Sequence, residues 1–175
     1  MNTEFLRLGD AEVFRRSRKG EKAMPNRLNV SIGNAGEYFV AGELERHGFT
    51  VAVPMSNVKD FDILAINRTT FEQFAIQVKT TGYKQKRWML TAKSEELQGK
   101  NIIYFFVSLN ELDVPEYHIV PSTVVAQTLK NSYEEWLKTP GRNGKPHREN
   151  TMRNFYDLDD TYLNRWDYLN IDLKA

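Results

Sequence analysis

The sequence contains no cysteine and only three histidines among its 175 residues. The absence of cysteine excludes a disulfide-stabilised scaffold, a thiolate metal site and a cysteine nucleophile. Two hydrolase patterns, Gly-x-Ser-x-Gly and His-Glu-x-x-His, are also missing. The histidines are scattered, and His118 lies within an expected strand, where packing or hydrogen bonding is its usual role. A metal-independent hydrolase of a familiar kind is therefore not expected.

Strong net charge and long apolar segments are lacking as well. The formal net charge is +1, so overall charge favours no class of partner and local clusters must be considered instead. The longest apolar run, residues 102–107, is too short to span a membrane and suits a buried strand. The first residues carry Glu4, Arg7 and Asp10 in place of the apolar segment of a signal peptide. We expect a cytoplasmic protein with no membrane partner.

The length and the apolar content are sufficient for one hydrophobic core, since 41% of the residues are hydrophobic. We expect a single domain over residues 1–175, with its core at about 31–125. Residues 126–175 are expected to form a helical and loop extension. A basic helix is expected at residues 3–19, where a solvated terminus is favoured over an arm that contacts phosphates.

The most informative segment is a predicted β-hairpin with strands at residues 60–67 and 74–81 and a turn at 68–70. Both strands are rich in Ile, Val and Phe, and polar residues bound them. Because side chains alternate along a strand, Gln77 and Lys79 emerge on one face about 7 Å apart. Asp62, in the neighbouring strand, can supply the charge opposite Lys79. An amphipathic hairpin with one solvated face explains the same pattern.

A helix is predicted over residues 31–47. Ser31 or Asn34 can cap its start, and Gly48 stands where a glycine commonly ends a helix. Gly33 and Gly36 are unfavourable inside a helix, at about 1 kcal/mol each relative to alanine. We therefore expect the helix backbone to approach a neighbouring strand closely.

Glu37 lies on the apolar side of this helix. The expected apolar stripe consists of Phe39, Val40, Ala41 and Leu44. A carboxylate on the inward face needs a partner, although a surface glutamate near a helix N-terminus is the commoner explanation.

The remaining elements alternate between short strands and helices. Strands are expected at residues 49–53, 87–91, 102–109 and 117–120, and helices at 121–130, 132–137 and roughly 158–169. The strand at 102–109 is almost wholly apolar, so both of its faces should be covered. The order of elements predicts an α/β fold with a single mixed central sheet flanked by helices.

Basic residues gather in two further segments. Lys84, Lys86 and Arg87 alternate with aromatic residues, which suits a nucleic-acid-facing surface or a solvated edge strand. Arg142, Lys145 and Arg148 lie in a loop rich in glycine and proline, which is either a plain surface loop or a phosphate-binding one.

The order of Glu37 on a helix, Asp62 in a strand and Gln77-Val78-Lys79 in the next strand resembles the PD-(D/E)XK nuclease superfamily. That superfamily includes restriction endonucleases and archaeal Holliday-junction resolvases. The resemblance covers about residues 33–109 and implies a restriction-endonuclease-like core. The sequence departs from the pattern in having Gln77 in place of an acid and no proline before Asp62. Asp60 is an alternative to Asp62.

The resemblance implies a divalent-metal-dependent nuclease that hydrolyses DNA. Glu37, Asp62, Gln77 and the Val78 carbonyl would hold Mg²⁺ or Mn²⁺, and Lys79 would act on the attacking water or on the developing charge. Basic residues would contact the nucleic-acid backbone, and a homodimer is left open. The alternative is an inactive module of the same fold that binds nucleic acid or a protein partner.

Overall fold

The computed structural model describes residues 25–54, 61–141 and 144–171. The chain divides into two compact units, Met1–Ser31 and Ile32–Ala175. Every described strand belongs to Ile32–Ala175. The expected basic helix at residues 3–19, Asp60 and Arg142 lie outside the described residues.

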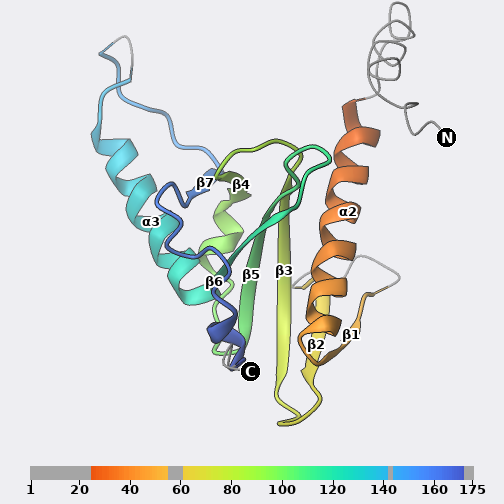
Figure 1. The fold of residues 1–175 in the computed structure, drawn as a ribbon. Helices are drawn as coiled ribbons and strands as arrows, with labels where there is room; N and C mark the ends of the chain where they lie inside the picture. The colour runs from red at the N-terminus through yellow and green to blue at the C-terminus, as the bar shows by residue number, and fades with distance from the viewer. Residues whose placement is uncertain (1–24, 55–60, 142–143, 172–175) are drawn as a thin grey trace, which may run out of the picture. The chain divides into compact units, whose positions relative to one another are not determined.

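A five-stranded mixed sheet forms the centre of the unit Ile32–Ala175, in the order β1-β2-β3-β5-β6 (Figure 1). Its strands are β1 Phe49–Ala52, β2 Ile63–Asn67, β3 Gln73–Thr81, β5 Ile102–Ser108 and β6 Glu116–Pro121. Strands β3 and β5 run parallel, and the other neighbours pair antiparallel. The helices are α2 Pro25–Arg46 and α3 Ser122–Lys138, with short 3₁₀ turns η1 Ala92–Glu95 and η2 Trp166–Leu169.

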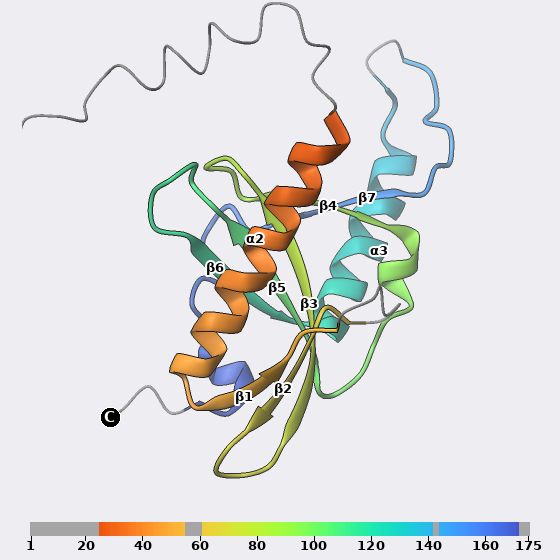
Figure 2. The ribbon, with the colours of Figure 1, turned by 90° about the vertical axis from the view of Figure 1, so that its right-hand side faces the viewer.

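The two faces of the central sheet are covered by different helices (Figures 1 and 2). On one face, Val40 and Leu44 of α2 pack in a cluster with Phe105 of β5. On the other face, Tyr104 of β5 packs in a second cluster with Val125 of α3. The predicted mixed sheet flanked by helices is therefore confirmed, and β5 is covered on both faces as expected. Neither described helix combines the length and apolar character that a membrane span requires.

A second, two-stranded sheet lies outside the predicted architecture. It pairs β4 Arg87–Thr91 antiparallel with β7 Met152–Tyr156. Trp88 and Phe155 are opposite one another and buried in the cluster beneath α3. The sequence predicted β4 but not β7. One of the two inward-facing positions of β7 is an arginine, so β7 lacks the alternating apolar pattern of a strand. Arg153 is only 7% exposed, and its guanidinium pairs with Glu95.

Several predicted element boundaries were wrong. Helix α2 begins at Pro25, so Ser31 and Asn34 lie within it and do not cap it. Proline is tolerated in the first helical turn, where its missing N–H would have no partner in any case. Phe39, assigned to the apolar stripe, is 47% exposed.

The C-terminal third also differs from the prediction. Helix α3 is continuous over Ser122–Lys138 instead of being two shorter helices. The expected helix at residues 158–169 is a series of turns that ends in η2, and Leu158 is exposed. Trp166 and Leu169 are nevertheless buried in the α2-side cluster, so their apolar character did indicate core packing.

At Gly36, α2 packs closely against Thr80 of β3. A Cβ atom added there would lie 1.9 Å from the Thr80 hydroxyl oxygen, whereas one added at Gly33 would meet nothing within 4 Å. The expected close approach is confirmed for Gly36 and wrong for Gly33. Gly36→Ala should therefore lower the free energy of unfolding by about 1–3 kcal/mol through overpacking.

Gly33→Ala is the matched control for that substitution. It should leave stability unchanged or raise it by up to about 1 kcal/mol, because alanine is the better helix former. Urea denaturation of the two variants measures both values. Equal effects of the two substitutions would contradict the packing of Gly36 against Thr80.

Candidate active site

Asp62 is fixed at the point where β2 begins and its pairing with β3 ends. Its backbone N–H donates to the Ile76 carbonyl at 2.8 Å, which completes the ladder between the strands. Its carboxylate oxygen Oδ2 accepts a hydrogen bond from the Val78 N–H at 2.7 Å. The side chain thus replaces the backbone acceptor that a longer β2 would have supplied. An oxygen held by sheet backbone in this way has a well-defined position.

The Val78 carbonyl faces the same open edge of β3. In an antiparallel pair, the backbone groups of residues two apart point to the same side of the strand. The Ile76 carbonyl faces β2, so the Val78 carbonyl faces that side as well. Because β2 does not extend this far, no strand of the described residues pairs with the Val78 carbonyl there. The Lys79 ammonium donates to it at 3.2 Å.

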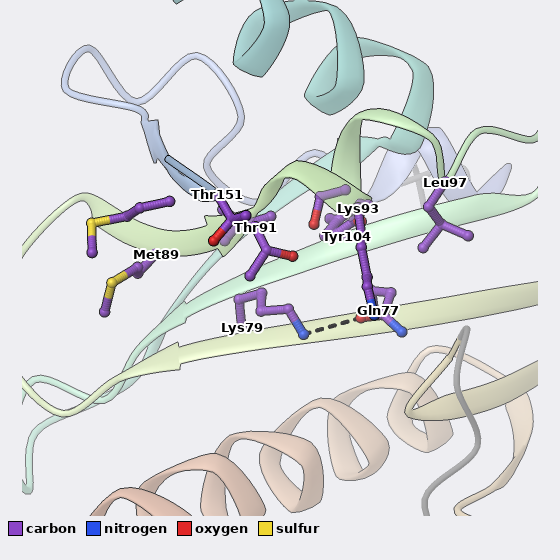
Figure 3. Close-up of a pocket in the computed structure, with 11 residues that line it drawn as sticks. Gln77, Lys79, Met89, Thr91, Lys93, Leu97, Tyr104 and Thr151 are labelled. Carbon is purple, nitrogen blue, oxygen red and sulfur yellow. Dashed lines mark hydrogen bonds between the residues drawn. The ribbon is translucent and has the colours of Figure 1, made fainter. Parts of the chain in front are cut away.

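The Lys79 ammonium is surrounded by oxygens from three residues. It donates to the Gln77 side-chain oxygen Oε1 at 3.0 Å (Figure 3) and to the Val78 carbonyl. Its nitrogen lies 3.9 Å from Asp62 Oδ2, an ion pair between partly buried side chains. A carboxylate, an amide and a carbonyl oxygen therefore converge around one cationic group.

Glu37 approaches this cluster from α2. Burial raises the pKa of its carboxyl above the ordinary value, and the negative charge of Asp62 raises it further, while Lys79 opposes the shift. Glu37 is thus within electrostatic reach of both residues. The structure therefore places Asp62 and Gln77 beside Lys79, and it places Glu37 within electrostatic reach of Asp62 and Lys79.

The raised pKa of Glu37 predicts a pH-dependent effect on stability. Because the folded protein holds this proton more tightly than the unfolded chain, the stabilisation is complete below the unfolded pKa. It is lost as the pH rises through the folded pKa. Glu37→Gln cannot ionise, so in metal-free buffer it should be more stable than the wild type at pH 7, with a smaller difference near pH 4.

Urea denaturation at the two pH values measures this difference. Glu111→Gln, at an exposed loop position, controls for the loss of one negative charge. A Glu37→Gln variant that is less stable than the wild type at pH 7 would contradict the environment assigned to Glu37.

The site has one carboxylate fewer than the PD-(D/E)XK pattern, which the sequence resembles. Among the described residues, no group of three or more Asp, Glu, His or Cys side chains is placed to hold a metal ion. Gln77 supplies a neutral oxygen where a third acid would stand. Two carboxylates, an amide oxygen and a backbone carbonyl are still hard oxygen donors of the kind that Mg²⁺ and Mn²⁺ accept. The cation that they surround, the Lys79 ammonium, shows that these oxygens favour positive charge.

A groove of about 690 Å³ opens beside Gln77 and Lys79 (Figure 3). It lies between β3, β4 and η1. Its remaining lining residues are Met89, Leu90, Thr91, Lys93, Ser94, Leu97, Tyr104, Thr151 and Met152. Sequence reasoning missed these residues, because the groove depends on the parallel register that sets Tyr104 beside Gln77 and on the pairing of β4 with β7.

The basic residues expected to contact nucleic acid lie in different settings. Lys84 is exposed, but the Lys86 ammonium pairs with Asp160, and this hydrogen bond raises the pKa of Lys86. Arg87 donates to the Asn154 side chain at 3.0 Å and shares the exposed face of β4 with Met89 and Thr91. Lys145 and Arg148 are exposed.

His118 lies away from this cluster. It is fully buried, and its Nδ1 lies 2.6 Å from Asp157 Oδ2. Asp157 also accepts from the backbone N–H groups of Thr161 and Tyr162, so it ties the C-terminal segment to β6. His118 is therefore a hydrogen-bonded core residue, as its place in a strand suggested.

Similarity between this chain and known proteins was found by comparison of structures and not by comparison of sequences. No protein-family model matches the sequence, and no curated protein does. Two nucleases of known structure are similar to the chain. One is a Holliday junction resolvase from Archaeoglobus fulgidus, with 18% identity and a TM-score of 0.43 over 71% of this chain and 84% of the resolvase. The other is a bacterial homing endonuclease, with 12% identity and a TM-score of 0.45 over 79% of this chain and 88% of the endonuclease.

Proposed function

We propose that the chain is a divalent-metal-dependent nuclease that hydrolyses DNA phosphodiesters. The observation that carries this proposal is the convergence of oxygens from Asp62, Gln77 and Val78 around the Lys79 ammonium. A cluster of oxygen donors next to a lysine meets the needs of phosphodiester hydrolysis. The oxygens hold a cation that neutralises the phosphate, and the lysine stabilises charge that develops in the transition state.

Each residue has a distinct part in the proposed reaction. Asp62, Gln77 and the Val78 carbonyl would hold Mg²⁺ or Mn²⁺ directly, and Glu37 would contribute through a water molecule. When bound, the ion would polarise the phosphate and lower the pKa of a coordinated water. The hydrogen bond from the Val78 N–H to Asp62 holds the Asp62 carboxylate at the sheet edge. The Asp62 and Val78 oxygens would therefore keep a constant spacing.

Lys79 must leave these oxygens when a metal ion binds, because its ammonium occupies the space that they surround. Its side chain is about one-third exposed, so it can turn toward a bound phosphate. There it would orient the attacking water or stabilise the negative charge on the phosphoryl oxygens.

A second candidate function is a non-catalytic module of the same fold. Gln77 favours it, because replacing an acid by an amide removes one negative charge from the metal ligands. In that case the groove and the basic residues would bind nucleic acid, or a protein partner, without cleaving it. The two candidates differ in whether the site binds a divalent ion.

A cleavage panel tests the nuclease. The full chain is incubated with plasmid, linear duplex, single-stranded and branched DNA, in Mg²⁺, in Mn²⁺ and in EDTA. Cleavage of at least one substrate with a metal and of none in EDTA is the expected result. Intact substrates under all conditions would leave the non-catalytic module as the function.

A further inference from the structure

The groove beside Gln77 and Lys79 has walls that suit a flat, partly apolar ligand. Met89 of β4 and Met152 of β7 are diagonal neighbours in the antiparallel register and are 61% and 52% exposed. Leu90, Leu97 and the Tyr104 ring add further apolar surface. Methionines so exposed at a groove present polarizable side chains that pack against flat aromatic ligands.

Hydroxyl groups lie among these apolar side chains. Thr91, Ser94 and Thr151 line the same groove, and each hydroxyl can both donate and accept a hydrogen bond. Tyr104 adds a phenol hydroxyl, which is protonated at neutral pH at its ordinary pKa of about 10, and burial raises this pKa further. Apolar walls with a few hydroxyls are a suitable surface for a nucleobase, which has apolar faces and polar edges.

The charged side chains that the described residues contribute to the groove lining are both lysines, Lys79 and Lys93. Arg87 stands on the same exposed face of β4 as Met89. Asp62 lies 3.9 Å from the Lys79 nitrogen and partly offsets its charge. The groove therefore complements a polymer with a negatively charged backbone mainly through Lys93 and Arg87.

The size of the groove limits what can enter it. Its volume of about 690 Å³ falls within the range of about 300–1,000 Å³ that is typical of small-ligand pockets. One or two nucleotides fit such a space, and an intact duplex does not. A base that enters the groove past Met89 and Met152 must therefore have left its base pair.

We propose that this groove holds an unpaired nucleotide directly beside the phosphate at Lys79. The preferred substrate is then DNA with an unpaired or displaced nucleotide next to the cleaved bond, and not an uninterrupted duplex. This inference rests on the proposed nuclease function in taking the bound strand to be the substrate. Leaving the stack costs least for a base that is already unpaired, which is the source of the selectivity.

Binding to two matched DNA molecules tests the inference without any cleavage step. One is a duplex with a single unpaired 2-aminopurine in the middle, and the other is the same duplex fully paired. Fluorescence anisotropy in EDTA measures both affinities, and the emission of 2-aminopurine reports the surroundings of the unpaired base. The wild-type chain should bind the unpaired site at least tenfold more tightly and change its emission.

Two groove variants and one control locate the effect. Met89→Asp and Met152→Asp place a negative charge on the groove wall at exposed positions and should abolish the preference for the unpaired site. Leu112→Asp, in an exposed loop, makes the same kind of change outside the groove lining and should keep the preference. Thermal melting checks that each variant is folded.

The outcomes separate this inference from the nuclease itself. Equal binding of the two duplexes, unchanged emission, or an undiminished preference in both groove variants would overturn the inference, even if the chain cleaves DNA. Preference for the unpaired site without cleavage of any DNA would support the groove and reject the nuclease. Folding failure of the variants leaves the wild-type emission change as the deciding result.

Discussion

Lys79→Met is expected to lower the rate of DNA cleavage by at least about a hundredfold, the loss typical when one preorganised charge-stabilising group is removed. The Lys79 ammonium lies among the oxygens of Gln77, Val78 and Asp62, so it is placed to contact a phosphate bound there. Methionine keeps an unbranched side chain and removes the charge together with the N–H donors of the ammonium. The measurement is the single-turnover cleavage rate in Mg²⁺ on the substrate that the wild type cuts best.

The same variant should still bind a metal ion, and more tightly than the wild type. The ammonium competes with the ion for the same oxygens, so its removal leaves two nearby carboxylates without a positive partner. Loss of cleavage with retained Mn²⁺ binding separates a catalytic role from a structural one. Lys130→Met, on the exposed surface of α3, is the control. A Lys79→Met enzyme with wild-type rates would remove Lys79 from the mechanism.

Gln77→Glu is expected to strengthen Mn²⁺ and Mg²⁺ binding by about tenfold or more, which corresponds to about 1.4 kcal/mol of binding free energy. Gln77 Oε1 already lies 3.0 Å from the Lys79 ammonium, so an additional carboxylate oxygen would enter the ligand set without moving the backbone. Part of the gain would be offset because the new carboxylate also attracts Lys79 and repels Glu37 and Asp62. Calorimetric titration measures the change.

Gln73→Glu is the matched control for that charge. It makes the same substitution four positions earlier on β3, at an exposed residue outside the groove lining. It should change the metal affinity little, because an exposed charge at that separation is largely screened. Equal gains from both substitutions would mean that Gln77 is not a ligand position. A loss of affinity in Gln77→Glu would mean that the amide itself is required.

The hairpin was the most predictable part of the fold because its information is local. Alternation along β3 predicted that Gln77 and Lys79 share one face, and both line the groove there. Phe74, Ile76 and Val78 point the other way and pack in the core. The boundaries of α2 and α3 were less predictable. Helix α2 opens at Pro25, six residues before its predicted start, and α3 continues through the polar residues near Ser132.

Features that depend on pairing between distant segments could not be predicted. Nothing local indicates that β7 pairs with β4, 65 residues apart at Met89 and Asn154, or that Tyr104 lies beside Gln77. The groove follows from both pairings, so its residues were missed even though the neighbouring Gln77 and Lys79 were found. The role of Asp62 as an acceptor for the Val78 N–H likewise depends on the residue at which β2 begins.

Calorimetric titration of Mn²⁺ into the wild type and Asp62→Asn tests the central claim most directly. Asparagine keeps one oxygen that can accept from the Val78 N–H, but it loses the negative charge and the second oxygen. We predict binding by the wild type that falls at least tenfold in Asp62→Asn, with both proteins equally folded by circular dichroism. No heat of binding in the wild type, or equal affinity in the two proteins, would contradict a metal site at this edge of the sheet.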